Sequence, residues 1–203
     1  MRNPPSFDVL VRDAEEHSFS GWDFSYIEPK RYQRGVPTWD YKSEVSKKMR
    51  SITTLLDMAT GGGEFLSSLR PFPEKPFATE SYAPNIPVAI NRLQPLGVKV
   101  VKVSSETKLP FTDSYFDLVI NRHEDYSPRE VYRILKDGGT FITQQVGDRN
   151  NIEINKSLQP ALHGKITSQH GTWNLARAVQ DLKEQAFKSY RERKSFPDQP
   201  SMT

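Results

Sequence analysis

The 203-residue sequence contains no cysteine. This absence excludes disulfide bonds, zinc sites with thiolate ligands and cysteine nucleophiles. No apolar run approaches the ~18–20 residues that a membrane-spanning helix requires. The first residues, MRNPPSFDVLVRDAEEHS, lack the apolar core of a signal peptide. We therefore expect a cytoplasmic protein without a membrane segment.

A strong excess of charge is also lacking. The chain has 28 Lys and Arg against 25 Asp and Glu, a net charge of +3. The whole surplus lies in residues 151–203, where eight basic residues face five acidic ones. The basic run Arg191–Lys194 is not accompanied by an aromatic platform of the kind on which nucleic-acid bases stack. This balance favours a small-molecule partner over a nucleic acid, and it leaves the oligomeric state open.

Hydrophobic residues make up only 35% of the chain, and there are 15 prolines. This composition predicts a compact core with poorly packed ends. We divide the chain into an N-terminal segment (1–50), a core (51–147) and a tail (148–203). We expect helices at Phe7–Glu16 and around Tyr41–Arg50 in the first segment. In the tail we expect a helix at Asn174–Phe187 and a weak strand at Phe187–Phe196.

Short apolar runs alternate with helical segments in the core. This alternation is typical of a parallel sheet built from strand–helix–strand units. The right-handed crossover rule then favours an α/β, Rossmann-like, doubly wound sheet. The expected strands are Thr53–Met58, Pro76–Glu80, Val98–Val103, Phe116–Asn121 and Thr140–Val146. The expected helices are Gly63–Arg70, Asn85–Leu93 and a third from Ser127 to Gly138 and Gly139.

Two of these helices carry start signals. Asn85 can cap the second helix, which has Pro87 in its first turn. Ser127 caps the third, Pro128 occupies its first position, and Glu130 completes a capping box.

The strongest functional signal is the segment Asp57–Glu64 (DMATGGGE), at the carboxyl end of the first strand. Ligands of open α/β sheets bind at this edge. Glycines let a backbone approach a ligand closely, and the N–H groups of a helix start favour an anionic group. The dinucleotide pattern fails because its third glycine would fall at Leu66, and a phosphate-binding loop fails because Glu64 follows Gly63.

A second acid, Glu80, ends the second strand, 23 residues after Asp57. An acid in this position can bind the two hydroxyls of a ribose. The alternative is an exposed acid in a loop.

The core resembles the class I S-adenosylmethionine-dependent methyltransferases. Their nucleotide motif is similar to Leu55–Gly63, and their ribose acid matches Glu80. Further stretches that match are Leu109–Asp113 (LPFTD), Phe116–Val119 (FDLV) and Glu130–Gly139 (EVYRILKDGG). The sequences FSGWDF (19–24), NRHE (121–124) and QQVG (144–147) are similar to one bacterial subgroup of that family.

The resemblance implies S-adenosyl-L-methionine as the cofactor and assigns the residues around it. Asp57, Ala59, Gly61 and Gly63 would line the methionine part. Glu80 would hold the ribose, and Ser105 and Glu106 would flank the adenine. Asn121 would face both the methionine part and the methyl acceptor. The family usually has glycine at the position of Ala59 and often has aspartate at the position of Ser105.

Methyl transfer requires no covalent intermediate on the enzyme, and a general base is optional. His123, just past the fourth strand, is the candidate base; the alternative is a loop histidine without a role. Glu124 and Asp125 follow it, but this grouping lacks the spacing of a metal site, so we expect no metal. Trp22, Phe24 and Trp39 form either a lid over the site or a cover for the sheet.

We thus expect a methyltransferase whose acceptor is unidentified. A non-catalytic or degenerate cofactor-binding fragment is one alternative, and a nicotinamide-dependent oxidoreductase is the other. The family usually has a seventh, antiparallel strand beside the fifth. Only Pro197–Thr203 follows the weak strand at 187–196, so we expect the seventh strand to be missing and the cofactor to bind more weakly.

Overall fold

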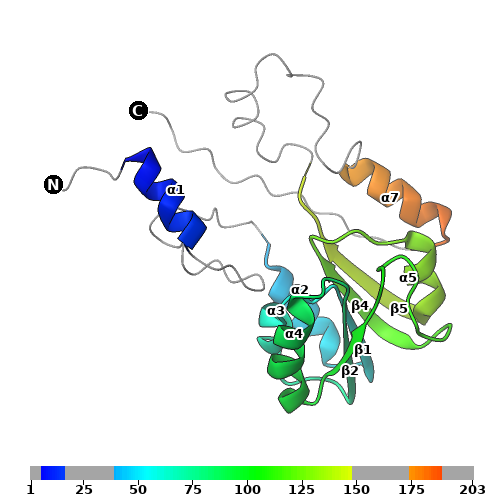
Figure 1. The fold of residues 1–203 in the computed structure, drawn as a ribbon. Coiled ribbons are helices and arrows are strands. Elements are labelled where there is room, and N and C mark those ends of the chain that lie inside the picture. Colours follow the sequence, from blue (N-terminus) through cyan, green and yellow to red (C-terminus); the bar gives the residue numbers. More distant parts are fainter. Residues whose placement is uncertain (1–5, 17–38, 148–173, 189–203) are drawn as a thin grey trace.

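A computed structural model describes residues 6–16, 39–147 and 174–188. Its centre is a five-stranded, all-parallel sheet in the order β3-β2-β1-β4-β5 (Figure 1). The strands are β1 (Thr54–Met58), β2 (Lys75–Glu80), β3 (Lys99–Lys102), β4 (Phe116–Arg122) and β5 (Leu135–Gln144). The helices are α1 (Phe7–Glu16), α2 (Tyr41–Met49), α3 (Glu64–Ser67), α4 (Asn85–Leu93), α5 (Pro128–Ile134) and α7 (Leu175–Glu184), with a short 3₁₀ turn η1 (Gln94–Leu96). The expected Rossmann-like sheet is confirmed.

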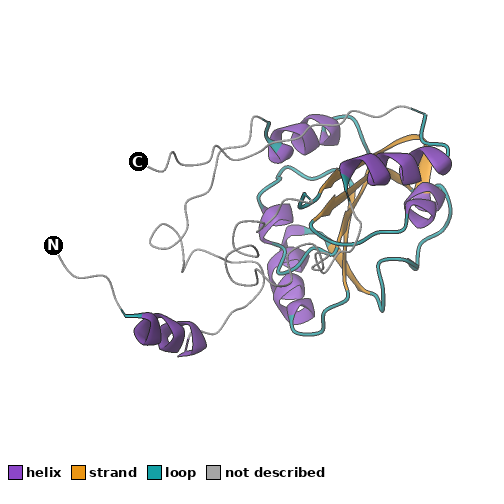
Figure 2. Cartoon of the chain, turned by 90° about the horizontal axis from the view of Figure 1, so that it is seen from above, coloured by secondary structure: helices purple, strands orange, loops and turns teal. Residues whose placement is uncertain are grey.

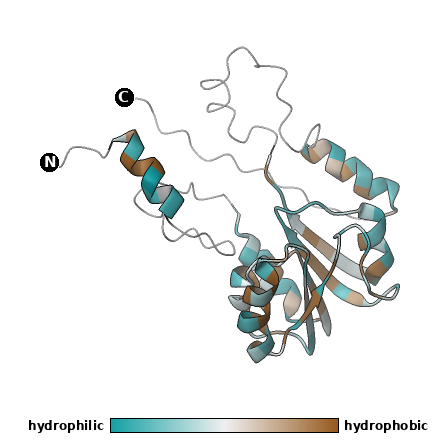
Figure 3. Ribbon diagram, in the orientation of Figure 1, coloured by the Kyte–Doolittle hydropathy of each residue, from teal (hydrophilic) through white to brown (hydrophobic). Residues whose placement is uncertain are grey.

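The central strands are apolar on both faces, because helices cover both sides of the sheet (Figures 2 and 3). Consecutive residues point to opposite faces. Leu55 and Leu118 therefore pack in one cluster, whereas Leu56 and Val119 pack in the other.

The first face is covered by α2, α3 and α4. Tyr41, Val45 and Met49 of α2 are buried in its cluster, together with Leu66 of α3 and Leu93 of α4. The helix α2 thus packs on the core, although it precedes the boundary that we place at residue 50. Trp39, one of the three aromatic residues considered for a lid, also packs against this cluster, whereas Trp22 and Phe24 lie outside the described residues.

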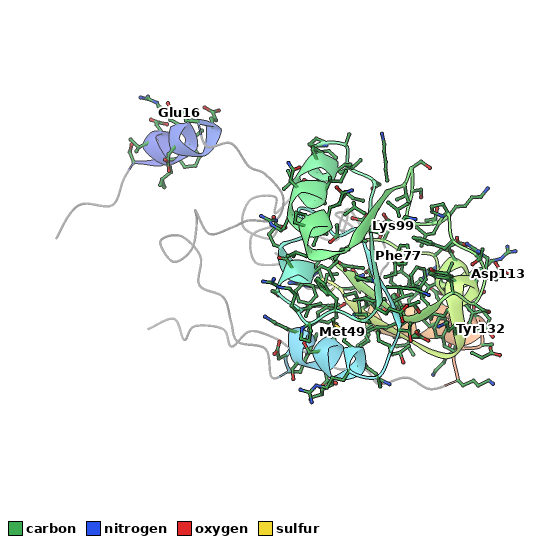
Figure 4. All side chains as sticks on the ribbon, turned by 90° about the horizontal axis from the view of Figure 1, so that it is seen from below. Glu16, Met49, Phe77, Lys99, Asp113 and Tyr132 are labelled. Carbon is green, nitrogen blue, oxygen red and sulfur yellow. The ribbon has the colours of Figure 1, made fainter. Side chains whose placement is uncertain are left out.

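The second face is covered by α5 and by the segment that connects β3 to β4. Val131 and Ile134 of α5 are fully buried there, and four aromatic rings meet edge to face around Phe77 and Phe116. At the sheet edge, the ammonium group of Lys99 lies 5.6 Å from the centre of the Phe77 ring (Figure 4). The helix α7 contacts α5 on this side.

Several helix boundaries differ from the sequence-based expectation. The helix expected over Gly63–Arg70 is the single turn α3. The N–H groups of Ser68 and Leu69 donate to carbonyls three residues back, which tightens and ends the helix, and Pro71 disfavours helical backbone at Arg70. Asn85 is the first residue of α4 and not its cap; Pro84 holds the cap position without a side-chain hydrogen bond. The tail helix ends at Glu184, before the expected Phe187.

The start of α5 confirms only half of the expected capping box. The Ser127 hydroxyl accepts the N–H of Glu130 at 3.3 Å, with Pro128 in the first turn. The Glu130 carboxylate does not return to Ser127. It accepts the N–H of Leu109 at 2.7 Å and pairs with Arg133, so it ties the preceding segment to the helix.

The end of α5 also differs, because the helix stops at Ile134 and not at the glycines. Its last carbonyls accept the N–H groups of Ser114 and Tyr115 at 2.8 Å, so no glycine cap is needed. Leu135 already belongs to β5 and pairs with Phe116. The next pair in register is Leu118 with Thr140, so residues 136–139 form a bulge. Gly138 adopts a positive φ of +76° inside this bulge.

Most of the weak strand expected at Phe187–Phe196 lies outside the described residues, and so does Pro197–Thr203. The expectation that the seventh strand is missing therefore stays a prediction. Within the described ranges, no helix is long and apolar enough to cross a membrane.

Candidate functional site

The predicted site residues gather where the strands end. Met58 of β1 pairs in register with Asn121 of β4, and Glu80 ends β2 beside Lys102 of β3. The strands β2 and β3 lie on one side of β1, and the later strands β4 and β5 lie on its other side. This is the topological switch point, where open α/β sheets bind ligands.

A glycine loop (Ala59–Gly63) follows β1. Ala59, Gly61 and Gly63 have positive φ angles of 52°, 64° and 80°. The positive φ at Ala59 explains why glycine suits this position better. A Cβ atom on Gly63 would come within 2.7 Å of Leu93 on α4, so this glycine is also required by packing.

Three successive residues of the glycine loop are anchored by three buried acids. The Gly61 N–H donates to Glu80 Oε2 at 2.7 Å. The Thr60 hydroxyl donates to Asp57 Oδ2, also at 2.7 Å. Ala59 is anchored indirectly, since its N–H donates to the Thr79 hydroxyl at 3.2 Å and that hydroxyl donates to Glu106 at 2.8 Å.

The other side of the loop is held by Arg92 of α4. Its guanidinium donates to the Gly62 carbonyl at 2.6 Å and pairs with the Glu64 carboxylate. Glu64 begins α3, which has only four residues. The first residue of this helix is thus itself an acid, and the expectation that the helix start favours an anionic group stays a prediction.

Negative charge accumulates in this site. Asp57, Glu80 and Glu106 are each at most 5% exposed. Burial raises the pKa of Asp57 to about 7; the Thr60 hydrogen bond and the charge of Arg122 oppose the rise, and the charge of Glu80 adds to it. Burial likewise raises the pKa of Glu106 to about 7, with the Thr79 hydrogen bond opposing it. A cation would relieve the repulsion among these carboxylates.

Glu80 is not an exposed loop acid. Its two carboxylate oxygens accept the N–H groups of Gly61 and Tyr82, both at 2.7 Å. Each oxygen retains a further lone pair that a hydroxyl could use. The residue therefore orders the glycine loop and can still accept hydrogen bonds from a ligand.

Asn121 is completely buried at the end of β4. Its Oδ1 accepts hydrogen bonds from the Thr143 hydroxyl at 3.1 Å and from Gln145 Nε2 at 2.6 Å. These bonds fix the orientation of the amide. Its Nδ2 has no hydrogen-bond partner among the described residues. Tyr41 of α2 supports the same strand end, because its hydroxyl lies 3.0 Å from the Asn121 carbonyl oxygen.

Arg122, the next residue, lies on the other side of the strand end. Its guanidinium stacks 4.6 Å from the centre of the Phe65 ring and 5.9 Å from that of Tyr41. Its charge lowers the pKa of Asp57. Arg122 thus partly balances the charge of Asp57.

Two further predicted residues follow strand ends, Ser105 after β3 and His123 directly after β4. Ser105 is half-buried and makes a local turn, in which its Oγ accepts the Thr107 N–H at 3.1 Å. His123 is exposed and has a φ of +60°, with its N–H donating to the Gln144 carbonyl at 2.9 Å. Its role as a base stays a prediction. The described residues contain no group of three or more His, Asp or Glu that could hold a metal ion.

Five site residues that act through hydrogen bonds to the glycine loop or to Asn121 were not expected from the sequence. These are Thr60, Thr79, Arg92, Thr143 and Gln145. Two of them lie in stretches that carried a signal: Gln145 belongs to QQVG, which is similar to the bacterial subgroup, and Thr60 lies within DMATGGGE. A buried threonine in a strand looks like any other β-branched residue.

Residues 56–143 match the family described as a methyltransferase domain. No curated protein matches the chain. Solved structures with the same fold include a Bacillus halodurans protein described as a methyltransferase, which is 23% identical with a TM-score of 0.55. The match covers 71% of this chain and 66% of that one, so the chain spans about two thirds of that protein's length.

Two further structures are described as S-adenosylmethionine-dependent methyltransferases. The Methanococcus maripaludis protein is 22% identical over 74% of this chain and 76% of its own, with a TM-score of 0.53. The Aquifex aeolicus protein is 16% identical over 89% of this chain and 88% of its own, with a TM-score of 0.55. Residues 56–143 therefore match a methyltransferase domain, and the core of this chain has the Rossmann-like fold that these structures share.

Proposed function

We propose that this protein binds S-adenosyl-L-methionine and transfers its methyl group to a small-molecule acceptor. The observation that carries the proposal is the set of three buried acids around the glycine loop, because this cofactor is a cation with a ribose and an amino-acid end. Two buried polar atoms without partners in the described residues, Glu106 Oε1 and Asn121 Nδ2, fit such a ligand as well.

Each part of the cofactor would be bound by different residues. Asp57 and the glycine loop would take the methionine part, and Glu80 the ribose. Ser105 and Glu106 would flank the adenine. When bound, the cofactor supplies an activated methyl group on a sulfonium sulfur.

The work of the protein is then to orient the acceptor and exclude water. Asn121 has a fixed amide and a free N–H donor at the strand end, so it would orient either the amino-acid end or the acceptor. His123 would accept the acceptor's proton where the acceptor must lose one. An acceptor without a proton to lose would need no base.

A thermal-shift assay tests cofactor binding. S-adenosylhomocysteine at 100 times its Kd should stabilise the protein by ~2.7 kcal/mol. At about 2–4 °C per kcal/mol, the Tm should rise by about 5–10 °C, whereas NADH and ATP should leave it unchanged. If NADH stabilises the protein and S-adenosylhomocysteine does not, the proposal is refuted and the oxidoreductase alternative is favoured.

The variant Glu80→Gln tests the ribose contact. Loss of charge-assisted hydrogen bonds of ~1.5–3 kcal/mol should weaken binding at least roughly tenfold. Glutamine is preferable to alanine, because it keeps an acceptor for the loop. Glu74→Gln is the matched control, since Glu74 is an exposed acid just before β2. An unchanged Kd in Glu80→Gln would remove Glu80 from the site.

Methyl transfer itself separates an enzyme from a non-catalytic binding protein. With methyl-labelled cofactor, label should enter a small-molecule extract and not RNA or DNA. The neutral balance of residues 1–150, with twenty basic and twenty acidic residues, supports this preference. Tight binding with no transfer to any fraction would favour the binding-protein alternative.

A further inference from the structure

Glu106 combines three properties that are unusual in one side chain. It is 5% exposed, it follows the β3 edge strand, and it has one oxygen bonded and one unbonded. Oε2 accepts the Thr79 hydroxyl at 2.8 Å. Oε1 is buried and has no partner in the part of the chain that the structure describes. A buried carboxylate in this state needs either a proton or a ligand.

Thr79 transmits the state of Glu106 to the glycine loop. Thr79 is fully buried in β2, and its carbonyl accepts the Thr60 N–H at 2.9 Å. Its hydroxyl has a single proton, which it gives to Glu106. The hydroxyl oxygen is therefore left as an acceptor for the Ala59 N–H. This relay helps to hold Ala59 at its positive φ.

Among the described residues, the charged groups that shift the pKa of Glu106 are acidic. They are Asp57 from β1, Glu80 from β2 and Glu124 from the loop after β4, and each disfavours the ionised form of Glu106. The cation Arg122 acts on Asp57 instead. Without a bound cation, the site thus favours retention of a proton near neutral pH.

We infer that Glu106 is a positioning residue that releases a proton when a cationic cofactor binds and regains it when the uncharged-sulfur product takes its place. This inference rests on the proposed function. S-adenosylmethionine carries one more positive charge than S-adenosylhomocysteine, because its sulfur is a sulfonium rather than a thioether. The site therefore favours cofactor over product more strongly as the pH rises.

Calorimetric titration of the full chain with each compound at pH 6, 7 and 8 tests this inference. The Kd of S-adenosylmethionine should fall with rising pH, with a limiting slope of about tenfold per pH unit for one proton. The Kd of S-adenosylhomocysteine should change less. Titrations in two buffers of different ionisation enthalpy should show proton release with the first compound.

Glu106→Gln is the decisive variant, because it keeps the shape of the side chain and an oxygen for Thr79. In this variant, the ratio of the product Kd to the cofactor Kd should depend on pH less than in the wild type, and the remaining dependence belongs to Asp57, whose pKa is also raised to about 7. Asp125→Asn is the control, since it removes an exposed carboxylate from the neighbouring loop. Retention of the wild-type pH dependence in Glu106→Gln would overturn the inference.

Thr79→Val tests positioning separately from charge. It removes the relay and keeps Glu106, so both Kd values should rise by about two- to tenfold while their ratio keeps its pH dependence. Unchanged Kd values in this variant would refute the positioning role. If neither compound binds the wild-type protein at any pH, the proposed function itself fails, and this inference fails with it.

Discussion

The raised pKa of the buried Asp57 predicts how much the free energy of unfolding changes with pH. Its folded-state pKa is about 7, compared with 3.8 for an unburied aspartate. Between these values the folded protein retains a proton that the unfolded chain has lost. The contribution of Asp57 to stability is therefore fully present below pH 4 and is lost as the pH rises through 7.

The loss of stability can be calculated from the shift in the pKa of Asp57. About three pKa units at 1.36 kcal/mol each correspond to about 4 kcal/mol. With about 2–4 °C per kcal/mol for a protein of this size, the Tm should decline by roughly 10 °C from this group alone. Asp57→Asn cannot ionise, so its decline between pH 4 and 8 should be smaller than that of the wild type by this amount.

Thermal unfolding at half-unit pH steps measures the effect in the absence of ligand. Some decline should persist in Asp57→Asn, because Glu106 also has a pKa raised to about 7. The double variant with Glu106→Gln should be nearly flat, whereas Asp125→Asn should follow the wild type. Parallel profiles for the wild type and Asp57→Asn would refute the assignment of a buried, proton-retaining acid at the end of β1.

Three further substitutions probe the fold around the site, each by urea unfolding. Gly63→Ala should destabilise by about 2–3 kcal/mol, because alanine is strained at φ +80° and its Cβ would press on Leu93; a neutral effect would refute the tight packing. Tyr41→Phe should cost about 1 kcal/mol, since its hydroxyl lies 3.0 Å from carbonyl oxygens on β4 and β5; unchanged stability would mean that it does not join these strands. The partners of Asp117, chiefly Lys136, hold the pKa of Asp117 well below its usual range, so wild-type stability should fall as the pH drops below 4, and Asp117→Asn should lose less; equal losses would contradict this pairing.

The sheet could be predicted because each of its strands can be recognised from its own short stretch of sequence. Apolar runs of five to seven residues separated by helical segments admit few topologies. The helix α4 was predicted to within one residue, because Asn85, expected as its cap, is its first residue, and Leu93 is its last residue as expected. The carboxyl-end placement of Asp57, Glu80 and Asn121 followed from strand direction alone.

The boundaries around α5 and β5 were less predictable, because they depend on contacts distant in sequence. The last carbonyls of α5 accept N–H groups from the segment just before β4. The glycines of the KDGG stretch looked like a helix end, but Gly138 and Gly139 serve the bulge instead. A Cβ atom on Gly139 would come within 2.8 Å of the Lys136 carbonyl oxygen and 3.1 Å of the Phe116 carbonyl oxygen. A local pattern cannot distinguish these two uses of a glycine pair.

In the site, too, the residues near strand ends could be predicted from the sequence, whereas their contacts with residues distant in the chain could not. The sequence identifies acids at strand ends, and a ligand is the evident use for them. The structure shows that Glu80 and Asp57 also hold the loop that they accompany, through Gly61 and Thr60. A substitution at either acid therefore changes both the ligand contacts and the loop. Binding measurements on charge-neutral, shape-preserving variants, with stability measured in parallel, are needed to separate the two effects.

The buried acids also constrain how the empty and loaded states differ in energy. A protein gains nothing in stability from burying three carboxylates together, because desolvation and mutual repulsion both oppose their ionisation. Here the hydrogen bonds from Gly61, Thr60 and Thr79 offset part of that cost, and a cationic ligand would offset more. Stability and affinity are then linked through the same protons: conditions that ionise the acids weaken the ligand-free fold and strengthen cation binding. The pH at which the free protein loses stability should therefore coincide with the pH at which cofactor affinity rises.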